Sequence, residues 1–242
     1  MSIAEKLKTI AENTPKVYAS GYSKGTAEGY SQAESDFWDA FQQNGNRTFY
    51  EYGFCNTAFE PLRPKHKVVP TSRVICMFEY LKKTKVIGKA YFDLSKCQIT
   101  TQSAGTGGYY ATFRGNEYSS LEVIEDIGMQ PGGYYQTFRY QQKLRTIEVL
   151  RVLENTKFDS AFYQCGSLEN LTIEGTIGQN NFNVSWSTKL SHDSLMSIIT
   201  ALKDYSTDTS GTQWVVTLGT TNLNKLTDAE KAMATQKGWT LA

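Results

Sequence analysis

The chain has few of the residues that build metal and catalytic sites. Its 242 residues include only two histidines and four cysteines. No two cysteines have the Cys-x-x-Cys spacing of a zinc or redox site. We therefore expect no metal or other cofactor, and we interpret the four thiols as small buried side chains.

Surplus charge and long apolar runs are also lacking. A formal net charge of +1 gives no electrostatic reason to expect nucleic acid or an anionic membrane as a partner. No apolar stretch approaches the roughly 20 residues that a membrane helix needs. The first eight residues mix charged with apolar side chains, unlike a signal peptide. The sequence thus predicts a protein made in a cytoplasm, with no nucleic-acid partner and no membrane insertion.

Catalytic motifs are missing too. The sequence has no G-x-S-x-G, H-E-x-x-H, Walker or dinucleotide-binding string. The acidic residues Glu122, Glu125 and Asp126 are a candidate cation site, but a half-exposed strand places the same residue types on its solvent face. A glycan hydrolase would need two carboxylates in a cleft, which a regular repeat does not supply. We predict that the protein is not an enzyme.

Aromatic residues and an internal repeat are what the chain has in abundance. The string GGYYATFR at 107–114 returns as GGYYQTFR at 132–139, 25 residues later, and a looser copy occupies 159–163. Apolar stretches follow the copies at 121–124, 144–149 and 168–173. A fixed period in the twenties is typical of a leucine-rich solenoid, whose units cannot bury their apolar face alone. The predicted fold is therefore an irregular leucine-rich-repeat solenoid of α/β character with a parallel β-ladder.

Residues 71–100 contain one more candidate repeat. Phe78 precedes Ile87 by nine residues, the same offset as from Phe138 to Ile147. Between Phe113 and Ile124 the offset is eleven, which predicts a two-residue insertion at 115–116. Asp126 stands where the strand should place an apolar residue, so we expect the first repeat, which begins with the copy at 107–114, to be distorted.

The N-terminal part predicts helices, over 2–13 and from Pro15 to about Gln43. Glycines recur every four residues in the second helix, and each should cost about 1 kcal/mol relative to alanine. One interpretation is a bare face for close helix contact and self-association; the other is a weakened arm that lies on the rest of the chain. The predicted oligomerisation arm comprises Gly21, Gly25, Gly29, Tyr18, Tyr22, Phe37 and Trp38.

From Leu190 onward the pattern alternates helix with strand. Ser191 and Thr227 are predicted N-caps, and Gly238 stands where a helix ends. Strands are predicted at 214–218 and 239–241. Such elements would cap the open end of a stacked sheet. The predicted domains are an arm over 1–45, a connecting loop region over 46–70, a solenoid over 71–189 and a cap over 190–242.

Several segments resemble known families. Ala161-Phe-Tyr-x-Cys165, followed by Leu168-Glu-Asn-Leu171-Thr-Ile173, resembles the BspA-type leucine-rich repeat; the two earlier copies depart from it by a threonine before Phe113 and Phe138 and by lacking the cysteine. Segments 17–21, 37–48 and 223–241 resemble tail-region structural proteins of phages and prophages of Gram-positive gut bacteria. This resemblance implies a virion protein.

The repeated tyrosine pairs are the candidate recognition surface. In consecutive repeats a Tyr-Tyr pair places one ring in the core and its neighbour outside, which generates an exposed column. Such columns stack on sugar rings and anchor protein interfaces; the alternative is that all the rings fill the solenoid interior. The candidate residues are Tyr109, Tyr110, Tyr118, Tyr134, Tyr135 and Tyr140, with Tyr163 in the third copy.

These features lead to one main functional hypothesis. We expect a virion protein of the tail tip, baseplate or fibre that presents a repeat surface for host or partner-protein recognition. The expected partners are further copies of itself in a symmetric homo-oligomer (a trimer is one option), other virion proteins, and a host surface glycan or protein. The alternative is a bacterial surface adhesin of the same repeat family.

Overall fold

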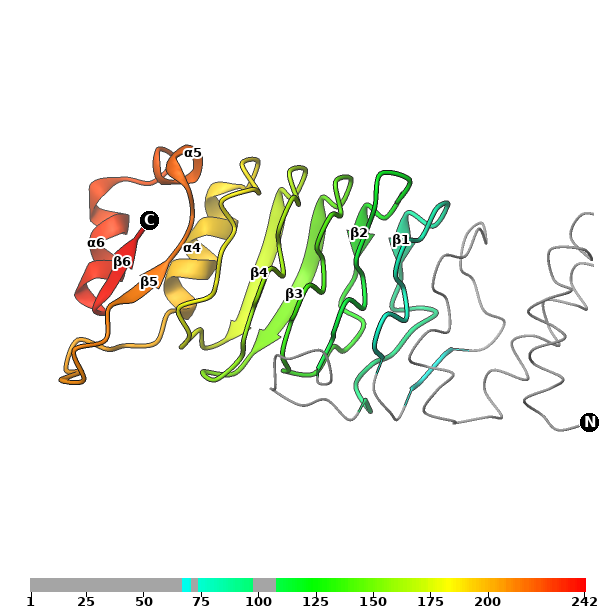
Figure 1. The fold of residues 1–242 in the computed structure, drawn as a ribbon, viewed down its shortest axis with the longest axis horizontal. Coiled ribbons are helices and arrows are strands. Elements are labelled where there is room, and N and C mark those ends of the chain that lie inside the picture. The colour runs from blue at the N-terminus through cyan, green and yellow to red at the C-terminus, as the bar shows by residue number, and fades with distance from the viewer. Residues whose placement is uncertain (1–66, 71–73, 98–107) are drawn as a thin grey trace, which may run out of the picture.

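The computed structural model of the 242-residue chain describes residues 67–70, 74–97 and 108–242 (Figure 1). The predicted arm, with Gly21, Gly25, Gly29, Tyr18, Tyr22, Phe37 and Trp38, lies outside the described residues, as do 46–66 of the connecting region. The self-association of this arm therefore stays a prediction, and so do the domain boundaries.

A four-stranded parallel sheet is the main feature of the described chain (Figure 1). Its strands are β1 (Val86–Ile87), β2 (Val123–Ile124), β3 (Thr146–Val152) and β4 (Asn170–Gly175), in the spatial order β1-β2-β3-β4. The register places the buried residues Ile87, Ile124, Ile147 and Leu171 side by side. The predicted α/β character and parallel ladder are confirmed, although β1 and β2 are only two residues long.

The predicted irregularity after the first copy, 107–114, has a visible cause. Phe113 stacks on Phe138 and Ile124 pairs with Ile147, so the two extra residues must lie between Phe113 and Ile124. They belong to a turn in which the N–H of Asn116 donates to Ser119 Oγ at 2.9 Å. A two-residue insertion is confirmed, but it begins after Gly115 and not at it. The N–H of Gly115 donates to the Arg139 carbonyl at 2.8 Å, as Tyr140 does to Tyr163, so Gly115 keeps its place in the ladder.

A second ladder runs beside the strands, and we call it the turn row: residues 74–80, 109–115, 134–140 and 158–164. Backbone N–H groups donate to the next segment, from Phe78 to Thr112 at 2.8 Å, and from Phe138 to Ala161 at 3.0 Å. Left-handed backbone recurs two positions before each phenylalanine, at Cys76, Ala111, Gln136 and Ser160, with φ between 49° and 56°. Because this conformation costs an L-residue about 1–2 kcal/mol, its recurrence shows that the hydrogen-bonded neighbours impose one backbone path on all four segments.

The core lies between the turn row and the strands. Phe113 stacks on Phe78 at 5.2 Å and on Phe138 at 5.8 Å, and Phe138 stacks on Phe162 at 5.4 Å between ring centroids. A second stack joins Tyr109, Tyr134 and Phe158 at 5.3 and 5.6 Å. All these rings are buried, so the two rows share one apolar core.

Helix α4 (His192–Ala201) ends the sheet. The hydroxyls of Ser194 and Ser197 each accept a hydrogen bond at 2.8 Å, from the N–H groups of Leu171 and Ile173 in β4. Two helical side chains thereby satisfy strand groups that a fifth strand would otherwise bind. The predicted N-cap at Ser191 is confirmed.

The remaining elements stack beyond α4 (Figure 1). They are β5 (Trp214–Val216), α5 (Thr220–Leu223), α6 (Asp228–Gln236) and β6 (Trp239–Leu241), and β5 pairs with β6 in parallel. Thr227 and Glu230 form the predicted capping box, and Gly238 has the positive φ of a residue that follows a helix. In the described part of the chain, no helix is long and apolar enough to cross a membrane.

Candidate recognition surface

Two of the six candidate tyrosines lie in the core. Tyr109 and Tyr134 are each 0 % exposed, so including them in a recognition surface was wrong. Inward and outward side chains alternate along this part of the turn row. The inward ring of Tyr134 stacks on the ring of Tyr109 on one side and on that of Phe158 on the other. Their chain neighbours Tyr110 and Tyr135 are partly exposed and stack at 5.5 Å. The expected split of each pair, one ring inside and one outside, is therefore confirmed.

The other two candidates belong to different places. Tyr118 is 64 % exposed and lies in the inserted turn, next to Ser119. Tyr140 lies in the turn row with left-handed backbone, φ 64°. Tyr163, of the third copy, meets Tyr140 edge to face at 5.6 Å. The structure thus brings Tyr140 and Tyr163 together.

One outward column of the turn row carries charge. The residue after each core phenylalanine is Glu79, Arg114, Arg139 or Tyr163 in successive segments. Arg114 forms an ion pair with Glu79, and its Nη1 donates to Gln136 Oε1 at 3.1 Å. Its guanidinium also lies 5.4 Å from the ring centre of Tyr80. The charge of Arg114 is therefore neutralised within the protein.

Arg139 has a different environment. Its guanidinium lies 4.7 Å from the ring centre of Tyr140 and 5.1 Å from that of Tyr163. Nη2 donates to the Tyr140 hydroxyl at 2.9 Å, while Nε is buried without an acceptor. Among the described residues, no carboxylate pairs with this arginine. Two electron-rich ring faces hold its positive charge but do not neutralise it.

Trp186 extends this group by one more segment. Its indole ring meets Tyr163 at 5.2 Å and is 49 % exposed. We call Arg139, Tyr140, Tyr163 and Trp186 the aromatic ridge. The sequence reasoning missed Arg139 and Trp186 as surface residues. A signal for Arg139 was present, because Phe-Arg recurs in both full copies of the repeat at an outward position.

The outer side of the strands contrasts with the ridge. Lys85 pairs with Glu122 at 2.9 Å, and Arg145 pairs with Glu169 at 2.9 Å. Arg151 donates two hydrogen bonds to Asp126, one to each carboxylate oxygen, at 2.7 and 2.9 Å. The hydrogen bond from Arg151 lowers the pKa of Asp126.

The candidate cation site is thereby accounted for by the protein itself. Glu122 and Asp126 have basic partners, and Glu125 accepts a hydrogen bond from the N–H of Lys89 at 2.9 Å. Across the ranges that the structure describes, no group of three or more histidine, cysteine or acidic residues could hold a metal ion. The acidic residues lie on the solvent side, as the strand pattern predicted.

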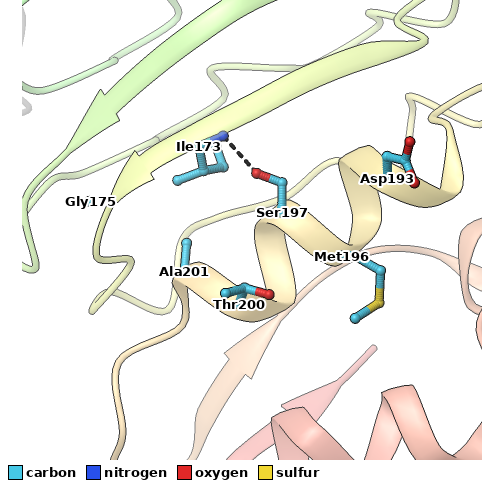
Figure 2. Close-up of a pocket in the computed structure, with 7 residues that line it drawn as sticks. All are labelled: Ile173, Gly175, Asp193, Met196, Ser197, Thr200 and Ala201. Atoms are coloured by element: carbon cyan, nitrogen blue, oxygen red, sulfur yellow. Dashed lines mark hydrogen bonds between the residues drawn. The ribbon is translucent and has the colours of Figure 1, made fainter.

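A depression of about 320 Å³ lies where β4 meets α4 (Figure 2). The hydrogen bond from Ile173 N–H to Ser197 Oγ crosses its lining, and Met196 adds an apolar wall. Asp193 is the one titratable residue that lines it, and its side chain is fully exposed. The depression therefore supplies no pair of groups for acid–base chemistry.

The described cysteines are also unsuited to chemistry. Cys76, Cys97 and Cys165 are buried, as the sequence predicted for its thiols. Burial raises the pKa of Cys97 and of Cys165 to about 12, so both stay protonated at neutral pH. The fourth, Cys55, lies outside the described residues.

Comparisons with protein families, curated proteins and solved structures found no match to this chain. The likeness to BspA-type repeats and to phage tail proteins therefore depends on the residues quoted from the sequence. The aromatic ridge is an observation independent of that likeness.

Proposed function

We propose that this chain is a virion protein of a phage tail tip, baseplate or fibre, and that it recognises a host surface or a partner protein through the aromatic ridge. The observation that carries the recognition function is the ridge itself. Three aromatic rings lie next to an arginine that has no carboxylate partner in the described parts of the chain, at the outer side of the turn row and of the segment that contains Trp186.

We further propose that the turn row and the strands are coils of one leucine-rich-repeat solenoid. Paired residues are 23 positions apart in the β2–β3 pair, from Ile124 to Ile147, and 24 apart in the β3–β4 pair, from Ile147 to Leu171. The β1–β2 pair, from Ile87 to Ile124, spans 37 positions, so the coil between these two strands would be longer. In the same two steps the stacked rings of the turn row are 25 and 24 positions apart, from Phe113 to Phe138 and from Phe138 to Phe162, whereas Phe78 lies 35 positions before Phe113. Each coil would supply one turn and one strand to a common core.

The composition of the ridge suits recognition. Binding hot spots are the interface residues whose replacement by alanine costs the most binding free energy, and they are enriched in tryptophan, tyrosine and arginine. Their backbone is held by ladder hydrogen bonds, such as Tyr140 N–H to Tyr163 C=O at 2.9 Å. A surface that is rigid before binding loses less conformational entropy on binding.

A cell-binding assay tests the recognition function. The fluorescently labelled full-length protein is added to a panel of Gram-positive gut bacteria, and we expect saturable binding to some of them. The double variant Tyr163→Ala, Trp186→Ala should bind at least about tenfold more weakly, because aromatic hot spots are worth about 2 kcal/mol or more each. Leu153→Ala is the matched control, since Leu153 is 48 % exposed and lies outside the ridge, against 49 % for Trp186. Equal binding by both variants would contradict the proposal.

The location is tested separately. Mass spectrometry of particles released from a lysed producing culture should find the chain in the purified virion. Recovery from the envelope of intact producing cells, and none from particles, would support the surface adhesin instead. Light scattering of the full-length protein measures whether it forms the expected homo-oligomer.

A further inference from the structure

Two arginines at equivalent positions of the turn row differ in how their charge is balanced. Arg114 and Arg139 each follow a core phenylalanine, and the two phenylalanine rings stack at 5.8 Å. Glu79 neutralises Arg114, whereas the Arg139 guanidinium donates to the Tyr140 hydroxyl and lies over two ring faces, with no carboxylate partner among the described residues. The same column thus contains one balanced and one unbalanced cation.

The unbalanced cation lies beside an exposed flat ring. Arg139 touches the ring of Tyr163, and Tyr163 touches Trp186, whose indole is half exposed. A ligand that covered this place would meet a positive charge at one end and an apolar ring face at the other. A positive charge is best complemented by an anion, and an exposed aromatic ring packs best against a flat apolar face of the same ligand.

We propose that the aromatic ridge binds an acidic sugar, with Arg139 pairing with the sugar carboxylate and Trp186 stacking on the sugar ring. This inference rests on the proposed recognition function and names the chemistry of its ligand. Arginine suits a carboxylate because its planar guanidinium can donate two parallel hydrogen bonds to the two oxygens.

The size of the ridge favours a sugar over an acidic protein segment. A stable protein interface occupies about 20–30 residues on each side. The ridge has four residues, and the next outward positions of the third segment are the polar Ser160 and Gln164. One or two sugar rings match such a short aromatic surface.

The test uses the full-length protein and defined oligosaccharides. Sialyllactose and a glucuronate-terminated disaccharide are the acidic probes, and lactose is the neutral one. Titration is followed by NMR of the protein with 5-fluorotryptophan, in which the Trp186 signal is assigned by its loss in Trp186→Phe. We expect an acidic probe to shift the Trp186 signal saturably. Lactose should bind at least about tenfold more weakly, because it lacks the carboxylate that would accept charged hydrogen bonds from Arg139.

Matched variants assign the charge to its residue. Arg139→Gln should weaken binding of the acidic probe at least about tenfold. Arg139→Lys should bind between the wild type and Arg139→Gln, because it keeps the charge but loses the paired donors. Arg145→Gln removes the same charge from the strand side, where Arg145 pairs with Glu169, and should bind like the wild type. Unfolding curves of each variant show whether it is folded.

Three results would overturn the inference: no shift with any acidic probe, equal affinity for lactose, or full affinity in folded Arg139→Gln. They leave the recognition function standing if the protein still binds cells. Protease treatment of the cells that abolishes binding, while periodate treatment does not, would identify a protein receptor and also overturn the inference. Failure of the recognition function itself is a different result, in which no cell is bound at all.

Discussion

The strands and the turn row are two ladders formed by alternating stretches of the chain, and their outer side chains differ in kind. Outside the strands, basic and acidic residues pair with each other, as Lys85 does with Glu122 and Arg151 with Asp126. Outside the turn row, aromatic rings surround Arg139, which has no carboxylate partner in the described structure. The strand side pairs its charges within the protein, whereas the turn row balances Arg114 with Glu79 and leaves Arg139 without a carboxylate partner among the described residues.

The backbone explains why the two ladders can differ. Along a regular strand, outer positions are separated by inner ones. In β3 this alternation is interrupted once, by a register shift between Ile147 and Leu150. In the turn row, left-handed residues such as Gln136 and Tyr140 bend the chain between outward side chains. Neighbouring segments place these side chains in columns whose rings touch, as Tyr110 and Tyr135 do. The bend also brings the chain neighbours Arg139 and Tyr140 into contact, whereas a strand points successive side chains to opposite faces.

The largest effect should come from the core that both ladders share. Phe138→Ala removes a fully buried ring between Phe113 and Phe162, and we expect it to lower the free energy of unfolding by about 3–5 kcal/mol. Tyr135→Ala, on the outer side of the same turn, should cost less than about 1.5 kcal/mol. Urea unfolding of both variants measures the difference. If hydrogen exchange showed the strands intact while the turn row had opened, the two ladders would not share one cooperative core.

A smaller effect should appear where the sheet meets α4. Ser194→Ala removes the acceptor of the buried Leu171 N–H and should cost about 1–3 kcal/mol, because an unpaired buried donor loses its solvation without compensation. The exchange rate of the Leu171 amide should rise with it. Thr200→Ala, on the exposed side of the same helix, should change stability by no more than about 0.5 kcal/mol. An unchanged Leu171 exchange rate in Ser194→Ala would show that the serine does not replace a strand.

Much of this fold was accessible from the sequence because its signals are local or periodic. The apolar stretches at 121–124, 144–149 and 168–173 predicted the neighbours of one sheet, and Ser191, Thr227 and Gly238 predicted the limits of two helices. Inside these stretches the strands begin two residues after Leu121, Leu144 and Leu168. These leucines are buried and come before the paired residues. The apolar pattern reports burial, and backbone pairing sets the strand limits.

The candidate surface was predicted only in part, for a physical reason. Sequence alternation correctly split each tyrosine pair into an inner and an outer ring, but it could not show which ring was which. That choice depends on left-handed residues such as Ala111 and Gln136, which are not glycine and carry no local signal. Trp186 was missed because its contact with Tyr163 joins positions 23 residues apart in a segment without the repeat motif.

The smallest expected effects are the stability costs of removing a balanced and an unbalanced charge, and these two costs should differ in how they depend on pH. Asp126→Asn and Arg139→Gln should each cost no more than about 1 kcal/mol at neutral pH, from a partly exposed ion pair and from cation–π contacts respectively. The folded-state pKa of Asp126 is lowered, so its stabilisation is complete above the unfolded pKa of about 3.9 and is lost as the pH falls through the lower folded value. As the pH falls below the unfolded value, the difference between wild type and Asp126→Asn should therefore shrink. Glu174, which also contacts Arg151 at 3.2 Å, is present in both proteins, so its contribution to the difference largely cancels.

The cost of Arg139→Gln should stay constant over the same pH range, because no carboxylate of the described chain pairs with Arg139. Urea unfolding from neutral pH down to about pH 3 measures both differences. A cost of Arg139→Gln that also disappeared in acid would reveal a carboxylate partner and remove the contrast on which the acidic-sugar site depends.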